Sequence, residues 1–300
     1  MAYTTINKAT DYFNTVLYEG NGATGRGITG VGFQPDFVWI KNRDATTPHV
    51  WQDSVRGVTK TRNSNDDSAD DTISNGLTAF GSDGFTIGGN GSFNQNGESF
   101  ASWNWKAGTT SGITTTGADI TPSAYSFNHT SGISIIKFTG NGVDGAKIAH
   151  GLGAAPEMII SKRLENANYW AVYHKMDNTD YLVLNTNAAY SDAPIWKDTD
   201  PTSVYYQTDN SNSVNPSGET VVAYCFKSVP GFSKIGAYTG NGLSSTPMFV
   251  YTGFKPKFVM VKNTSQTDDW FMHDDKRDGY NDDNEYLFPS STGVEGTNTN

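Results

Sequence analysis

The chain has 300 residues, 31 acidic against 21 basic side chains, and a net charge of −10. Its Lys and Arg are scattered, which argues against a nucleic-acid-binding protein, because such proteins gather basic residues into patches. One cysteine, Cys225, excludes a disulfide framework within the chain, and we interpret it as a small core residue. No apolar stretch reaches membrane-spanning length, and the residues after Met1 are too polar for a secretory signal.

One short pattern occurs three times, with Gly three residues before a Pro and Lys six residues after it. The copies are residues 32–43, 151–163 and 253–263. Apolar residues rich in Val, Ile, Phe and Met lie between the Pro and the Lys, which predicts a buried strand. Each copy follows an Asn-Gly pair typical of a tight turn, so we expect strand, hairpin-type turn and strand. The lysine is interpreted as the point where the strand leaves the core.

The first module is predicted over residues 1–106, including a short lead-in. After its central strand come a polar, acidic loop at residues 63–75 and a hairpin at Asp83-Gly84. A closing strand follows Gly97-Glu98. We expect Glu98 to make a structural hydrogen bond.

Residues 107–131 are rich in Gly, Thr and Ser and are predicted to be a connector, in which Ile113, Ile120, Tyr125 and Phe127 are candidates for packing against a neighbour. The second module covers residues 132–227, with an extra strand at residues 181–185, a polar loop at residues 204–213 and a closing strand after Gly218-Glu219. The distance from central-strand Pro to closing Gly is 62 residues in both modules. Equal spacing over this length indicates a tandem array.

Residues 228–300 are predicted to be a third, incomplete module. At the same spacing its closing strand would begin near residue 318, and we expect the module to be cut before that point. Only about ten residues separate the second module from the third Asn-Gly turn. We therefore expect these two modules to touch and the first to be more loosely tethered.

Few residues in the sequence indicate a catalytic, metal-binding or ligand-binding site. Asp53, His174 and Asp274 occupy one module position, and because the residue type changes freely there, no catalytic residues are predicted. The acidic loop at residues 65–71 lacks the spacing of an EF-hand, so a solvated loop is preferred to a calcium site and no metal is predicted. Trp196 is the one residue predicted to contact a ligand, by stacking on a sugar ring.

Several segments, among them residues 1–7, 32–43, 53–57, 103–106 and 173–175, together resemble a repeat family of virion-associated proteins. These proteins belong to marine tailed bacteriophages, especially those infecting cyanobacteria. The resemblance covers nearly the whole chain. It implies tail-fibre-like proteins whose folds are compared to concanavalin-like or laminin-G-like sandwiches.

We therefore expect an all-β protein made of tandem antiparallel β-sandwich modules of jelly-roll type. The expected function is that of a non-enzymatic bacteriophage virion structural protein, a tail fibre or other surface appendage that aids host attachment and is assembled in the host cytoplasm. The expected partners are other virion proteins, further copies of the chain and a host-surface glycan, without nucleic acid, membrane insertion or cofactors. Two alternatives stay open: an enzyme acting on host-surface polysaccharide, and a capsid-decorating protein that binds no ligand.

Overall fold

The computed structural model describes residues 4–243, 246, 248–277 and 285–297, and it is all-β. Helices in these ranges are limited to the 3-10 turn η1 (Ala9–Asp11) and the one-turn α1 (Gly91–Asn94). Neither has the length and apolar character needed to cross a membrane. The strands form antiparallel sheets that pack as sandwiches, as the sequence predicts.

Module 1 is a sandwich of two antiparallel sheets. The larger sheet has the order β1 (Phe13–Glu19), β9 (Ser99–Trp105), β3 (Phe37–Asn42), β4 (Val50–Asp53), β5 (Lys60–Asn63) and β6 (Asp71–Thr72). The smaller sheet has the order β2 (Arg26–Thr29), β8 (Gly84–Ile87) and β7 (Leu77–Gly81). Because side chains alternate along a strand, Val38 and Ile40 of β3 face the smaller sheet and Phe37 and Trp39 face the opposite way.

Module 2 repeats this plan with additional edge strands. Its larger sheet has the order β10 (Ala124–Asn128), β11 (Ile133–Thr139), β18 (Thr220–Phe226), β13 (Met158–Arg163), β14 (Ala171–His174), β15 (Asp177–Val183) and β16 (Ser191–Asp192). Its smaller sheet pairs β12 (Ala146–Ala149) with β17 (Tyr205–Thr208). Cys225 is buried between the two sheets, which confirms its predicted core position.

Module 3 contains a part of the same plan. In the described residues β19 (Phe258–Lys262) pairs with β20 (Trp270–Asp274), and β21 (Glu285–Tyr286) pairs with β22 (Gly296–Thr297). The register of the central pair is the same in all three modules. Opposite residues are Trp39 and Trp51, Ile160 and Val172, and Met260 and Met272.

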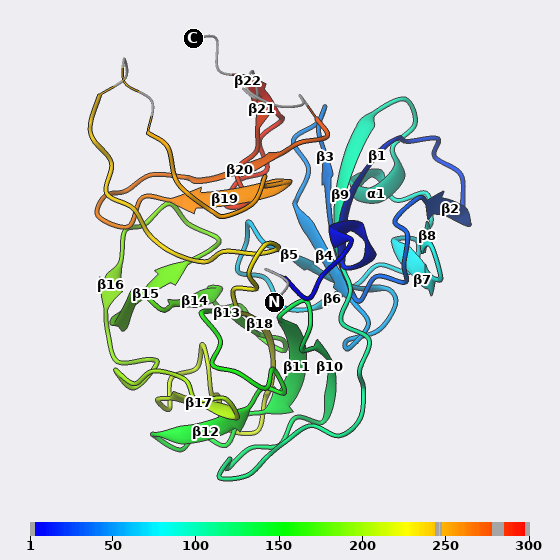
Figure 1. Cartoon of the computed structure of the whole chain (residues 1–300). Coiled ribbons are helices and arrows are strands. Elements are labelled where there is room, and N and C mark those ends of the chain that lie inside the picture. Colours follow the sequence, from blue (N-terminus) through cyan, green and yellow to red (C-terminus); the bar gives the residue numbers. More distant parts are fainter. Residues whose placement is uncertain (1–3, 244–245, 247, 278–284, 298–300) are drawn as a thin grey trace.

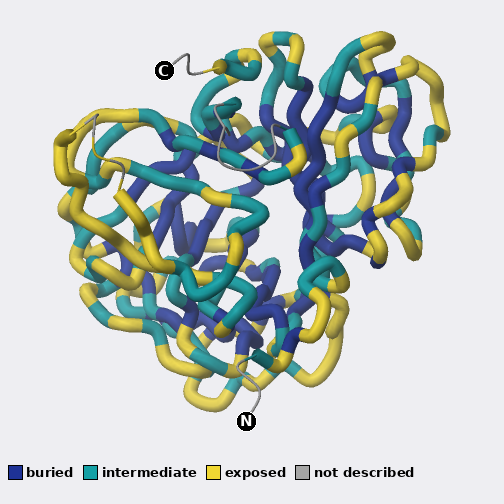
Figure 2. Tube along the Cα trace, turned by 45° about the horizontal axis from the view of Figure 1, so that its top comes forward, coloured by how far each residue is buried: buried dark blue, intermediate teal, exposed yellow. Residues whose placement is uncertain are grey.

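The three modules are arranged around the middle of the molecule (Figure 1). There they share one apolar core. Each complete module has its own core between its two sheets, and the outer face of each larger sheet contributes to a further core in the middle of the molecule. Its buried members include Trp51, Trp103, Trp170, Tyr224 and Trp270. Figure 2 shows buried segments on the inner sides of the modules and exposed loops at the periphery. We call the contact region around this shared core the junction.

The shared core contradicts the prediction that module 1 is loosely tethered, because module 1 packs against both other modules. The predicted connector is also wrong in part, because it contains strand β10, which pairs with β11. Ile120, a candidate for packing against a neighbour, is buried in the core of module 2. The packing of module 1 against the other two modules depends on contacts between distant segments, which local composition does not encode.

Two local predictions need correction. The Asn21-Gly22 turn, in which Gly22 has a φ of +67°, leads from one sheet to the other instead of closing a hairpin. The predicted polar loop at residues 204–213 contains strand β17. The Asp83-Gly84 hairpin is confirmed by the pairing of β7 with β8.

Candidate functional site at the module junction

Each central strand has, as its last or second-last residue, a lysine that binds a neighbouring module. The Nζ of Lys41 lies 3.4 Å from the carbonyl oxygen of Thr292 in module 3, and the Nζ of Lys162 lies 2.8 Å from that of Asp67 in module 1. The Nζ of Lys262 lies 3.3 Å from the carbonyl oxygen of Asn187 in module 2. The lysines therefore make one kind of contact in cyclic order around the junction.

The prediction that these lysines mark the exit of the strand from the core is wrong for Lys41 and Lys162, which are fully buried. Burial lowers the pKa of Lys41 to about 8 and that of Lys162 to about 7, because the low-dielectric surroundings disfavour the ammonium. Backbone carbonyls satisfy the buried donors. These lysines therefore join modules.

A second repeated position also joins modules. The indole Nε1 of Trp170 donates to the carbonyl oxygens of Asn63 at 3.0 Å and Asp66 at 3.1 Å, both in module 1. The Nε1 of Trp270 donates to the carbonyl oxygen of Val183 in module 2 at 3.0 Å. These two tryptophans therefore follow the cyclic order of the lysines.

Modules 1 and 3 each hold a buried ion pair that a neighbouring closing strand covers. Arg56 Nε bonds Asp53, and Tyr224 of β18 donates its hydroxyl to the same carboxylate at 2.7 Å. Arg277 Nε bonds Asp274 at 2.6 Å, and Trp103 of β9 donates its indole N–H to this carboxylate at 3.1 Å. Buried charges require such pairing because desolvation of a lone charge is costly.

Module 2 has different residues at this position. His174 replaces the aspartate, and Asp177 replaces the arginine three residues later. Both side chains are half-buried, and desolvation lowers the pKa of His174 below its usual value. Of the three repeated positions, Asp53 and Asp274 therefore bind a neighbouring module, and the hydrogen-bond partner of His174 is the Met176 amide of its own module.

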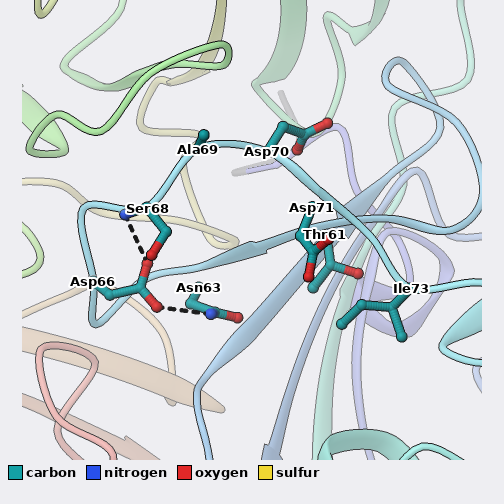
Figure 3. A pocket seen from close by; sticks show the side chains of 8 residues that line it. All are labelled: Thr61, Asn63, Asp66, Ser68, Ala69, Asp70, Asp71 and Ile73. Atoms are coloured by element: carbon teal, nitrogen blue, oxygen red, sulfur yellow. Dashed lines mark hydrogen bonds between the residues drawn. The ribbon is translucent and has the colours of Figure 1, made fainter.

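The acidic loop of module 1 borders a hollow of about 230 Å³ (Figure 3). Asp66 accepts hydrogen bonds from Asn63 at 2.7 Å and from the Ser68 amide at 3.1 Å. Asp70 Oδ1 accepts from Arg56 at 2.8 Å. Across the described ranges, no three His, Cys, Asp or Glu side chains converge on a metal position. The carboxylates of this hollow serve to fix the loop.

The same loop is more than the solvated loop that was predicted. Asp67 is exposed, but the Asp70 amide donates to the carbonyl oxygen of Leu164 at 2.7 Å, and the Asn168 amide donates to that of Asp67 at 2.8 Å. The buried Arg62 also donates to Leu164, at 2.7 Å. The loop therefore attaches module 1 to module 2.

Trp196 is not placed to stack on a sugar, and the structure corrects that prediction. Its side chain is 2 % exposed and lies edge-to-face against Tyr173 and Tyr206, at centroid distances of 5.9 and 6.0 Å. These rings belong to the core of module 2. The apolar faces of the indole are covered by the protein itself.

The two recurring glutamates make structural hydrogen bonds, as predicted. Glu98 accepts from the Asn42 amide at the end of β3, and Glu219 pairs with Arg163 at the end of β13. The hydrogen bond from Arg163 lowers the pKa of Glu219. Each glutamate therefore fixes the start of a closing strand to the end of a central strand.

One repeated sequence pattern indicates the two buried ion pairs and was not used in the prediction. Asp53-Ser-Val-Arg56 and Asp274-Asp-Lys-Arg277 share an Asp and an Arg three residues apart at equivalent module positions. This repeated pair could have indicated the two ion pairs. Their hydrogen-bond donors from other modules have no local sequence signal.

The fold and the junction define the class of protein: a chain of antiparallel sandwich repeats joined around a shared core. The chain belongs to the family described as "Domain of unknown function (DUF7483)", whose profile matches residues 8–300. No curated protein and no solved structure matches the chain.

Proposed function

We propose that the chain is a non-enzymatic structural part of a bacteriophage particle, a tail-fibre-like or other surface appendage that aids host adsorption. The observation that carries the proposal is the junction, where buried lysines, tryptophans and Asp–Arg pairs join each module to the next. Modules move relative to one another unless their interface is large and apolar. The shared core favours one rigid block, which suits a part that transmits force between particle and host.

The location on a particle is supported by the resemblance of the module motifs to virion-associated proteins of marine tailed phages. Immunogold labelling of purified particles, with antibody raised against residues 1–227, tests it. The proposal expects label on the particle, at the tail for a fibre or at the head for a capsid decoration. Strong expression during infection without label on particles would contradict it.

Host adsorption is a separate part of the proposal and has its own test. Binding of the purified chain to an array of host-surface glycans is expected, and a silent array would favour a decorating protein without ligand binding. Reducing-end release from the same glycans should not occur. If it does, the alternative of a polysaccharide-acting enzyme replaces the proposal.

A further inference from the structure

A closing strand covers one edge of the central strand in modules 1 and 2, and no described strand covers the equivalent edge of β19 in module 3. In module 1 the amide of Asp36 donates to the carbonyl oxygen of Trp105 at 2.8 Å, and in module 2 that of Glu157 donates to Phe226 at 2.7 Å. Within the described part of the chain, β19 pairs with β20 alone. Val259 of β19 is 37 % exposed, whereas its equivalents Val38 and Ile159 are fully buried.

The occupied modules show which strand fits this edge. Trp105 and Phe226 lie opposite the first residue of the central strand, and Trp103 and Tyr224 lie opposite its third. On β19 these positions are Phe258 and Met260. An antiparallel strand with two aromatic residues separated by one position therefore matches the β19 edge.

Modules 1 and 2 also show how the start of a closing strand binds the end of the central strand. Glu98 binds Asn42 and Glu219 binds Arg163, each on the residue that follows the lysine of the central strand. The equivalent residue of module 3 is Asn263, which is exposed. An incoming strand with a glutamate at its start would place this carboxylate beside the Asn263 amide.

The cyclic order of the junction also indicates which residue of module 2 a closing strand on module 3 would contact. Tyr224 of module 2 binds Asp53 of module 1, and Trp103 of module 1 binds Asp274 of module 3. The remaining step of the cycle leads from a closing strand on module 3 to His174 of module 2. The Nδ1 of His174 accepts a hydrogen bond from the Met176 amide at 3.3 Å, so a neutral ring carries its proton on Nε2.

This histidine selects between the two aromatic donors that the chain uses elsewhere. A tyrosine hydroxyl oxygen can accept a hydrogen bond from the Nε2–H group, whereas an indole N–H can only donate one. Nearby Met158, the equivalent of the fully buried Phe37, is half-buried. An incoming strand with tyrosine opposite Met260 would satisfy His174.

We propose that the β19 edge is a docking site for a partner polypeptide strand of the closing-strand class, with Glu at its start and Tyr opposite Met260. The sequence contains two Gly-Glu dipeptides, at Gly97 and Gly218, and the strands that follow them are already paired on both sides. Neither of these two strands is therefore free to cover the β19 edge. Binding of the partner strand extends a sheet by main-chain hydrogen bonds and covers apolar surface.

The probe is a labelled peptide copying residues 218–227 with Cys225→Ala, added to the purified chain. We expect a saturable one-to-one complex, and hydrogen exchange slowed at residues 258–262. Two control peptides carry Tyr224→Phe or Val222→Pro. The first should bind several-fold more weakly, and the second should not bind, because proline removes a donor and breaks the strand.

A gain-of-binding variant separates this site from unspecific apolar binding. Asn263→Arg copies Arg163, and it should raise affinity for the Glu219 peptide about tenfold, the equivalent of one charge-assisted hydrogen bond. It should not change affinity for a peptide carrying Glu219→Gln.

Two results would overturn the proposal. One is a chain that is dimeric without peptide and protects residues 258–262, since a second copy would then cover the edge. The other is a monomeric chain that binds none of the peptides. Neither result bears on whether antibody labels a virion, so this inference and the proposed function fail independently.

Discussion

The hydrogen bond between Tyr224 and Asp53 offers a sharp test of the junction, because one atom of module 2 stabilises a charge of module 1. Tyr224→Phe removes the hydroxyl that lies 2.7 Å from Asp53 Oδ2 and keeps the ring in the shared core. Asp53 retains Arg56 and the amide of Val55, so the ion pair survives with one donor fewer. A hydrogen bond to a charged group contributes about 1.5–3 kcal/mol, and we expect a loss near 2 kcal/mol in the free energy of unfolding.

Urea unfolding followed by far-UV circular dichroism measures this loss as a lower midpoint. Tyr206→Phe is the matched control, since the Tyr206 hydroxyl is buried in module 2 and has no hydrogen-bond partner within the described ranges. Its removal should leave stability unchanged or slightly higher, because an unsatisfied polar group is deleted. Equal losses in both variants would refute the proposed contact between modules.

Three further changes probe the same region. Trp170→Phe removes the indole donor to module 1 and should cost about 1–2 kcal/mol in urea unfolding, with no loss if the modules are not joined there. Arg277→Met leaves Asp274 as an uncompensated buried charge and should cost about 3–5 kcal/mol, which a thermal scan would record as a lower Tm; an unchanged Tm would contradict the buried pair. The lowered pKa of Lys162 means that the unfolded chain binds more protons than the folded chain between about pH 7 and the ordinary lysine range. Stability should therefore rise from pH 7 to pH 9, and Lys162→Met should reduce this rise.

The repeat was predictable because its signals are local. A proline, an apolar run and a lysine at fixed spacing indicated the central strands, and Gly-Glu followed by alternating apolar residues indicated the closing strands. The structural role of Glu98 and the core position of Cys225 followed from the same local patterns.

The junction was not predictable in this way, because its contacts join segments far apart in sequence. Lys41 meets Thr292 from 251 positions away, and a lysine after an apolar run looks the same whether solvent or another module receives it. Trp196 was misjudged for a related reason. Its polar neighbours in sequence suggested a surface loop, while Tyr173 of β14 and Tyr206 of β17 cover its ring.

Hydrogen exchange at the amides of Asp70 and Asn168 tests the central claim that the modules form one joined block. Both amides belong to loop segments, and each donates across the junction between modules 1 and 2, at 2.7 and 2.8 Å. We predict that both exchange as slowly as amides within strands β3 and β13. Exchange at the rate of an open loop would show that the modules separate in solution, and would contradict the claim.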